Sequence, residues 1–165
     1  METGGLFIRD ARLAVDGILS MNAQDLADIQ AIRDLQNWYS YSIDAGLYDN
    51  LDDIFSGDVI ADYGPAGYND GVAAVKETCR GALEPLTAVQ HINGNQVAQI
   101  NGNTATASCY FHVHQHREGT EGGDHFEMGG RYDDELERRP EGWRITKRRL
   151  TLIWSAGNPD VRWQR

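Results

Sequence analysis

The order of two sequence patterns, helical periodicity first and strand-like alternation second, constrains the fold of this chain more than any other feature. Asn22 has the side chain of an N-cap and Asp25 follows three residues later, which predicts a helix over about residues 23–43. The apolar residues that recur at helical spacing within it are Leu26, Ile29, Ile32, Leu35 and Trp38. The pattern beyond this helix predicts a short helix over Tyr48–Phe55, a strand over Val59–Tyr63 and a helix over residues 71–83.

After Pro85 the periodicity changes to alternation interrupted by turn residues. Asn101-Gly102 is a strong hairpin signal, and Pro140-Glu141-Gly142 marks a second turn. The strands predicted around these turns cover residues 87–100, 104–116, 125–138 and 143–154. Helices followed by an antiparallel meander are typical of an α+β fold and not of a βαβ repeat.

Composition excludes several classes of function. With 165 residues the chain is long enough for one domain with a sizeable core. Fifteen basic against 25 acidic residues give a net charge of −10, which argues against nucleic-acid binding. No apolar run is long enough to span a membrane, and Cys79 and Cys109 are too few for a disulfide scaffold. We therefore expect a cytoplasmic protein with free thiols that binds neither nucleic acid nor membrane.

The five histidines all lie in the second half of the chain. His112, His114 and His116 alternate along a predicted strand, so their side chains share one face. This pattern is compatible with proton transfer, with metal binding through His112, His114 and His116 or Glu118, or with an exposed polar stripe. The sequence pattern alone leaves the three interpretations open.

Asp44 is a second candidate for chemistry because it ends the first predicted helix directly after the apolar Ile43. The alternative is that Asp44 simply caps the helix that follows, which is a common role for aspartate.

Several of these residues together resemble the SnoaL-like family. The resemblance rests on the helical run from Ile29 to Asp44, the isolated His91, the Gly129-Gly130-Arg131-Tyr132 stretch and the final strand with Trp143 and Arg148. It covers about residues 23–156, and implies an N-terminal extension over residues 1–21 and one domain over residues 22–165. The implied fold is a cone-shaped α+β barrel in which N-terminal helices pack on a curved antiparallel sheet and enclose a pocket.

The resemblance also implies which residues form a site. Asp44 and His91 match a catalytic aspartate–histidine pair, Tyr39 a catalytic tyrosine and Arg148 a pocket arginine on the final strand. His114 lies near an additional acid–base position on a central strand, with His112 two residues away on the same face. Residues expected to bind the substrate are His112, Tyr110, Tyr41, Met128, Tyr132, Leu150 and Leu152.

The implied activity is that of a cofactor-free lyase, with His91 as the base that removes a proton from carbon. The substrate would be a small hydrophobic, hydroxylated molecule with an aromatic or cyclic body. Deformylating retro-aldol cleavage of a lignin-derived diarylpropane, isomerisation and polyketide cyclisation on the same site remain open. A metal-dependent enzyme and a non-catalytic binding or assembly module are further alternatives.

Relatives of this kind imply a homo-oligomer, with a trimer favoured and a dimer possible. Phe111 and Val113, opposite the histidines, are expected to be buried between subunits, and Trp38, Trp143 and Trp154 in the core or at such a contact.

Overall fold

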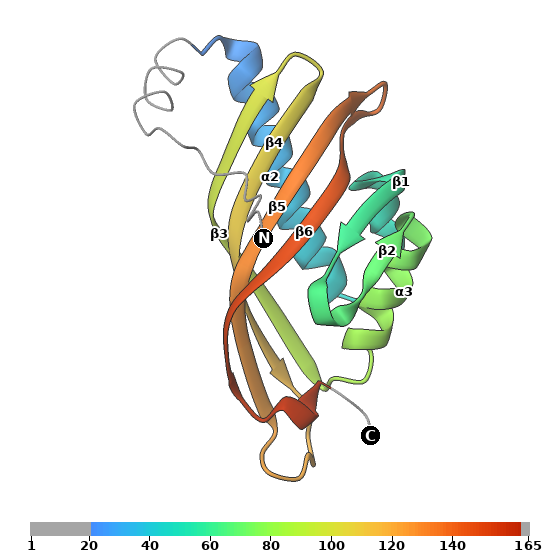
Figure 1. The fold of residues 1–165 in the computed structure, drawn as a ribbon, viewed down its shortest axis with the longest axis vertical. Coiled ribbons are helices and arrows are strands. Elements are labelled where there is room, and N and C mark those ends of the chain that lie inside the picture. Colours follow the sequence, from blue (N-terminus) through green and yellow to red (C-terminus); the bar gives the residue numbers. More distant parts are fainter. Residues whose placement is uncertain (1–20, 163–165) are drawn as a thin grey trace, which may run out of the picture.

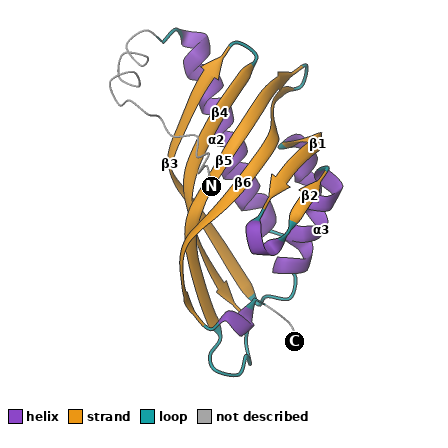
Figure 2. Cartoon of the chain, viewed as in Figure 1, coloured by secondary structure: helices purple, strands orange, loops and turns teal. Residues whose placement is uncertain are grey.

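A computed structural model describes residues 21–162, so the expected extension over residues 1–21 lies almost wholly outside the described residues. Two α-helices, three 3-10 helices and six strands make up this part of the chain (Figures 1 and 2). In chain order they are α2 (Ala23–Asp44), η1 (Tyr48–Asp53), β1 (Phe55–Asp62), η2 (Gly64–Ala66), β2 (Tyr68–Asp70), α3 (Val72–Leu83), β3 (Ala88–Asn101), β4 (Thr104–His116), β5 (His125–Arg139), β6 (Gly142–Gly157) and η3 (Pro159–Val161). The α+β class predicted from the sequence is confirmed.

The six strands form one curved sheet in the order β2-β1-β6-β5-β4-β3. The neighbours are antiparallel, as predicted, except β1 and β6, which run parallel and make the sheet mixed. Parallel pairing arises because β6 returns beside β1 after three intervening strands of the meander. Figure 1 shows α2 lying against one face of the long strands, with β1, β2 and α3 gathered beside them.

The first helix begins where the sequence predicts. The Asn22 side chain accepts from the backbone N–H groups of Gln24 and Asp25, and the Asp25 carboxylate accepts from the Asn22 backbone, which completes a capping box. The buried face of the helix is only partly the predicted one, because Ile32 is buried and Leu35 packs against the core. Leu26 and Trp38 are more than half exposed. The residues of α2 that are buried are Asp28, Ile32, Gln36, Tyr39, Ser40, Ser42 and Ile43.

The short helix predicted over Tyr48–Phe55 ends earlier than expected, and the strand after it begins earlier. The 3-10 helix η1 stops at Asp53, and Phe55 already pairs with Ile145 of β6. Phe55 and Val59 are both fully buried. Pairing with β6 and burial therefore start β1 at Phe55, which the helical spacing had assigned to the short helix.

The core lies between the sheet and the helices. Trp143 is buried there, as predicted, and its indole N–H donates to Asp28 of α2. Trp38 and Trp154 are about half exposed and do not belong to the core of this chain, so a subunit contact stays the prediction for these two. Phe111 and Val113 are almost fully buried within the chain's own core, which contradicts their expected burial between subunits. No helix in the described range is both long and apolar enough to cross a membrane.

Candidate active site

His91 and Asp44 lie in direct contact although they are far apart in the sequence. Asp44 is the last residue of α2 and His91 lies on β3, which packs against that helix. The Nδ1 atom of His91 is 2.6 Å from Oδ1 of Asp44, and the backbone N–H of His91 donates to Oδ2 at 2.7 Å. Because the carboxylate accepts at Nδ1, that nitrogen carries the proton, and in the neutral imidazole the free lone pair lies on Nε2.

The position of Asp44 is unfavourable for the helix alone. A negative charge at a helix C-terminus opposes the macrodipole at a cost of about 0.3–1 kcal/mol, and the last turn of α2 contains no basic residue. Asp44 does not cap the next helix either, since η1 begins at Tyr48 and has no side-chain cap. Its carboxylate is held by His91 instead, which favours the functional interpretation of this residue.

His91 lines a cavity of about 250 Å³. An apolar cavity of roughly 150 Å³ already accommodates benzene, so this space suits a molecule of one or two rings. The walls are mainly apolar or aromatic and come from α2, the segment after β1, α3 and the long strands. The residues that line it are Tyr39, Ile43, Tyr63, Pro65, Ala66, Glu77, Thr78, Cys79, Gly81, Ala82, Leu83, His91, Gln115, Met128, Tyr132, Leu150, Leu152 and Arg162.

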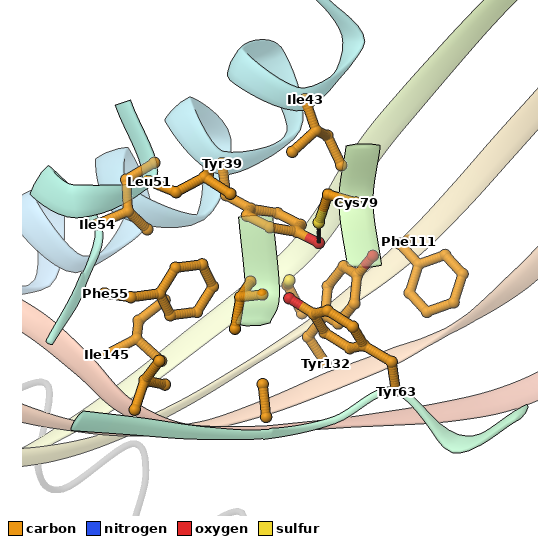
Figure 3. Packing of buried hydrophobic residues seen from close by; sticks show 14 of the residues in the cluster. Tyr39, Ile43, Leu51, Ile54, Phe55, Tyr63, Cys79, Phe111, Tyr132 and Ile145 are labelled. Atoms are coloured by element: carbon orange, nitrogen blue, oxygen red, sulfur yellow. Dashed lines mark hydrogen bonds between the residues drawn. The ribbon is translucent and has the colours of Figure 1, made fainter. Parts of the chain in front are cut away.

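Three tyrosines that line this cavity come from distant parts of the chain. Tyr39 lies on α2, Tyr63 directly follows β1 and Tyr132 lies on β5, and Figure 3 shows their rings packed close to one another. Burial raises the pKa of all three phenols, which keeps each hydroxyl protonated and available as a hydrogen-bond donor at neutral pH. The Tyr39 hydroxyl lies 3.7 Å from Sγ of Cys79, and burial raises the pKa of that thiol to about 11.

Arg148 is fully buried and does not face the cavity, so the expectation of a pocket arginine is wrong. Its Nε and Nη2 atoms donate to the two carboxylate oxygens of Asp134 at 2.7 and 2.8 Å, and both side chains are completely inaccessible. The guanidinium lies 4.4 Å from the ring centre of Tyr39 and 4.5 Å from that of Tyr132. Arg148 therefore supports two rings of the cavity wall from behind.

The strand β4 presents its histidines to the outside of the sheet. His91 pairs with Val113, and directly paired residues point to the same face, so Val113 and Gln115 face the cavity. His112 and His114 point the other way and have side chains 49% and 42% exposed. Tyr110 is likewise about half exposed. The predictions that His114 acts at the site and that His112 and Tyr110 bind the substrate are wrong by one step of strand alternation.

The outer histidines contact one another instead. Nε2 of His114 is 2.9 Å from Nδ1 of His125, and Nδ1 of His114 is 3.2 Å from Oε1 of Glu127. The ring of His116 stacks on that of His125. Within residues 21–162 no group of three or more His, Cys, Asp or Glu side chains is arranged to hold a metal ion. The metal-dependent alternative therefore lacks a preformed site in this part of the chain.

Of the remaining expected site residues, one lies away from the cavity and the others line it. Tyr41 is 61% exposed and packs edge-on against Trp38, away from the cavity. The other expected residues line the same cavity as His91, namely Tyr39, Met128, Tyr132, Leu150 and Leu152.

Sequence reasoning missed Tyr63, Cys79 and Gln115, all of which line the cavity. Tyr63 and Cys79 carry no distinguishing sequence signal. Gln115 does, because it is the polar member of an otherwise apolar alternating set on β4: Ala105, Ala107, Cys109, Phe111 and Val113.

Comparison with known proteins decides the family. Residues 24–149 match the SnoaL-like domain. The chain belongs to this family. An uncharacterized protein of Mycobacterium tuberculosis, Rv2910c, is 30% identical over 134 residues, which cover 78% of this chain and 87% of that protein. An uncharacterized protein of Mycobacterium bovis, Mb2934c, matches to the same extent.

Solved structures share the fold at lower identity. The Kfla4162 protein of Kribbella flavida superposes with a TM-score of 0.77 at 18% identity, covering 84% of this chain and 98% of that one. A candidate scytalone dehydratase from Novosphingobium aromaticivorans gives 0.74 at 22% identity, over 82% and 91% of the two chains. A hexachlorocyclohexane dehydrochlorinase gives 0.73 at 17% identity, over 86% and 95%. Lyase-type enzymes are thus among the proteins that share this fold.

Proposed function

We propose that this SnoaL-like protein is a cofactor-free lyase of the dehydratase type, in which His91 removes a proton from an activated carbon atom of a small cyclic substrate. The observation that carries the proposal is the His91–Asp44 pair, which places an imidazole with a free Nε2 in the wall of a largely apolar cavity.

The pair suits proton abstraction for electrostatic reasons. When Nε2 takes the proton, the imidazolium is stabilised by the Asp44 carboxylate, whose Oδ1 lies 2.6 Å from Nδ1. The second bond to Asp44, from the His91 backbone, fixes the carboxylate relative to the strand that carries the base. General acid–base catalysis of this kind contributes roughly 10²–10⁴-fold.

The carbanion needs a partner for the charge that develops on a neighbouring carbonyl oxygen. Arg148 is shielded behind the rings of Tyr39 and Tyr132, whereas the phenols that line the cavity can donate to such an oxygen. Tyr63 fits this role because it lines the cavity and burial raises the pKa of its phenol, so the hydroxyl keeps its proton. A donor already fixed in an apolar site stabilises an oxyanion more than one in water does.

The electron flow follows from these positions. The C–H bonding pair moves into the carbonyl to form an enolate, and then forms the carbon–carbon double bond as the β-hydroxyl leaves. The departing hydroxide takes the proton from the His91 imidazolium, so the products are an unsaturated carbonyl compound and water. Isomerisation differs only after this proton transfer and remains an outcome of the same assay. Retro-aldol cleavage would instead begin with removal of the hydroxyl proton by His91 and would break the carbon–carbon bond to give an enolate and an aldehyde.

Deuterium exchange in D₂O tests the first step independently of the leaving group. The probes are 3-hydroxycyclohexanone, a β,γ-unsaturated cyclic ketone and an aromatic β-hydroxy ketone, with exchange followed by NMR and enone formation by ultraviolet absorbance. We expect the wild type to catalyse exchange, and His91→Ala to lose about 10²–10⁴-fold. Asp44→Asn should also be strongly impaired, because a neutral amide stabilises the imidazolium less.

The matched control is His112→Ala, which removes an imidazole from the outer face of the neighbouring strand. Exchange by this variant should equal that of the wild type. Undiminished exchange by a folded His91→Ala protein, or no exchange by the wild type with any of the three probes, would contradict the proposal.

A further inference from the structure

Gln115 is a buried amide without a hydrogen bond at its oxygen. The residue lies on the cavity-facing side of β4 and is 3% exposed. Its Oε1 atom has no hydrogen-bond partner among the described residues. Its directly paired neighbours, Val89 on β3 and Phe126 on β5, are both apolar and cannot supply one through their side chains.

An amide at this position is costly for the protein alone. The same face of β4 carries apolar residues at every preceding alternate position from Ala105 to Val113. A methionine or leucine would occupy the same place without leaving a buried acceptor unpaired, which destabilises a folded protein. The oxygen is therefore best explained by a donor that enters the cavity.

We propose that Oε1 of Gln115 accepts a hydrogen bond from a hydroxyl group of the substrate, so that the cavity selects a hydroxylated ring. This deepens the proposed function and rests on it for treating the ligand as a substrate, but the selection itself is a property of binding. The three buried phenols supply donors, whereas Gln115 supplies an acceptor on the wall of β4.

The separation between Gln115 and His91 indicates which carbon atom of the ring carries this hydroxyl. Gln115 pairs with Val89, two residues before His91, and His91 pairs with Val113, so the two site residues are diagonal neighbours on adjacent strands. Diagonal same-face positions are roughly 7–8 Å apart. A single six-membered ring fits between them, with its acidic carbon at Nε2 and its hydroxyl on a distant ring carbon.

The test uses two pairs of rings with equal numbers of non-hydrogen atoms: phenol with toluene, and anisole with ethylbenzene. Binding to the wild-type protein is followed by NMR titration, with no turnover required. We expect phenol to bind about tenfold or more tightly than toluene, the size of one hydrogen bond to a buried group otherwise unpaired. Anisole, which has an oxygen but no donor, should bind no better than ethylbenzene.

Gln115→Met keeps the approximate size of the side chain and removes the acceptor. In this variant the preference should reverse in favour of toluene, the more apolar ring. The His91→Ala variant should keep the preference for phenol, because the contact is to Gln115. Loss of the preference in His91→Ala would instead show that the imidazole binds the hydroxyl, and would overturn the proposal.

Three other results would overturn it: equal binding of phenol and toluene to the wild type, a phenol preference that survives in Gln115→Met, or no binding by any of the four rings up to their solubility. Tighter binding of anisole than of ethylbenzene that is lost in Gln115→Met would show that the amide donates rather than accepts. Because none of these measurements involves proton abstraction, failure of the lyase proposal and failure of this one are distinguishable.

Discussion

The buried ion pair between Arg148 and Asp134 gives a stability prediction of defined size. Both side chains are completely inaccessible, and Asp134 also accepts from Nε2 of Gln36 at 3.2 Å. In Arg148→Met the carboxylate keeps only this one neutral donor in a buried site. Removing one partner of a buried pair costs about 3–5 kcal/mol, and the lost contacts with the rings of Tyr39 and Tyr132 fall within that range. We expect the free energy of unfolding to fall by this amount.

Urea unfolding of the four proteins of a double-mutant cycle measures this loss of unfolding free energy. The cycle comprises the wild type, Arg148→Met, Asp134→Asn and the double variant, and the double should be more stable than the sum of the single losses predicts. A coupling of about 0.5–3 kcal/mol is expected for residues in direct contact. The control is Arg149→Met, the adjacent and exposed arginine on the same strand, which should change stability by less than about 0.5 kcal/mol. A loss below about 1 kcal/mol for Arg148→Met, or additive losses in the cycle, would refute the argument.

Two further predictions concern ionisation. Hydrogen bonds from Arg138 and the Trp143 indole lower the pKa of Asp28, so its stabilising effect is present above the unfolded-state pKa of about 3.9 and is lost as the pH falls through the lower folded-state value. Urea titrations should therefore show Asp28→Asn less stable than the wild type at pH 6, with a gap that narrows below about pH 4; a gap independent of pH would contradict this. Burial raises the pKa of Cys79 to about 11 and that of Cys109 to about 12, so both thiols should resist Ellman's reagent in the native protein at pH 8 and react in urea. Rapid labelling of either thiol under native conditions would show that the cavity admits the reagent or that the core opens.

The elements of the fold were predictable because their signals are local. The Asn22 capping box sets the start of α2, and Asn101-Gly102 places the turn between β3 and β4. The parallel pairing of β1 with β6 left no such signal, because it joins segments far apart in the chain. It also explains why Phe55, at the end of a stretch with helical spacing, starts a strand.

The contact between two of the expected site residues was predictable from the resemblance, whereas the placement of the residues on β4 depends on strand alternation and was not. Asp44 and His91 meet as the resemblance implies. On β4 the resemblance drew attention to the histidines, although the apolar set that includes Cys109, Phe111 and Val113 marks the buried face. Since a shift of one residue exchanges the two faces of a strand, the hydrophobic pattern was the better guide.

The placement of β6 has a consequence for how the protein is made. This strand is synthesised after the other five, yet it lies inside the sheet, between β1 and β5. Until it emerges from the ribosome, no strand pairs β1 and β2 with the meander, and Phe55 lacks its pairing partner Ile145. Pairings between such distant segments form slowly. We therefore expect the nascent chain to remain without a closed cavity until its final strand arrives, and truncations within β6 to abolish folding rather than trim an edge.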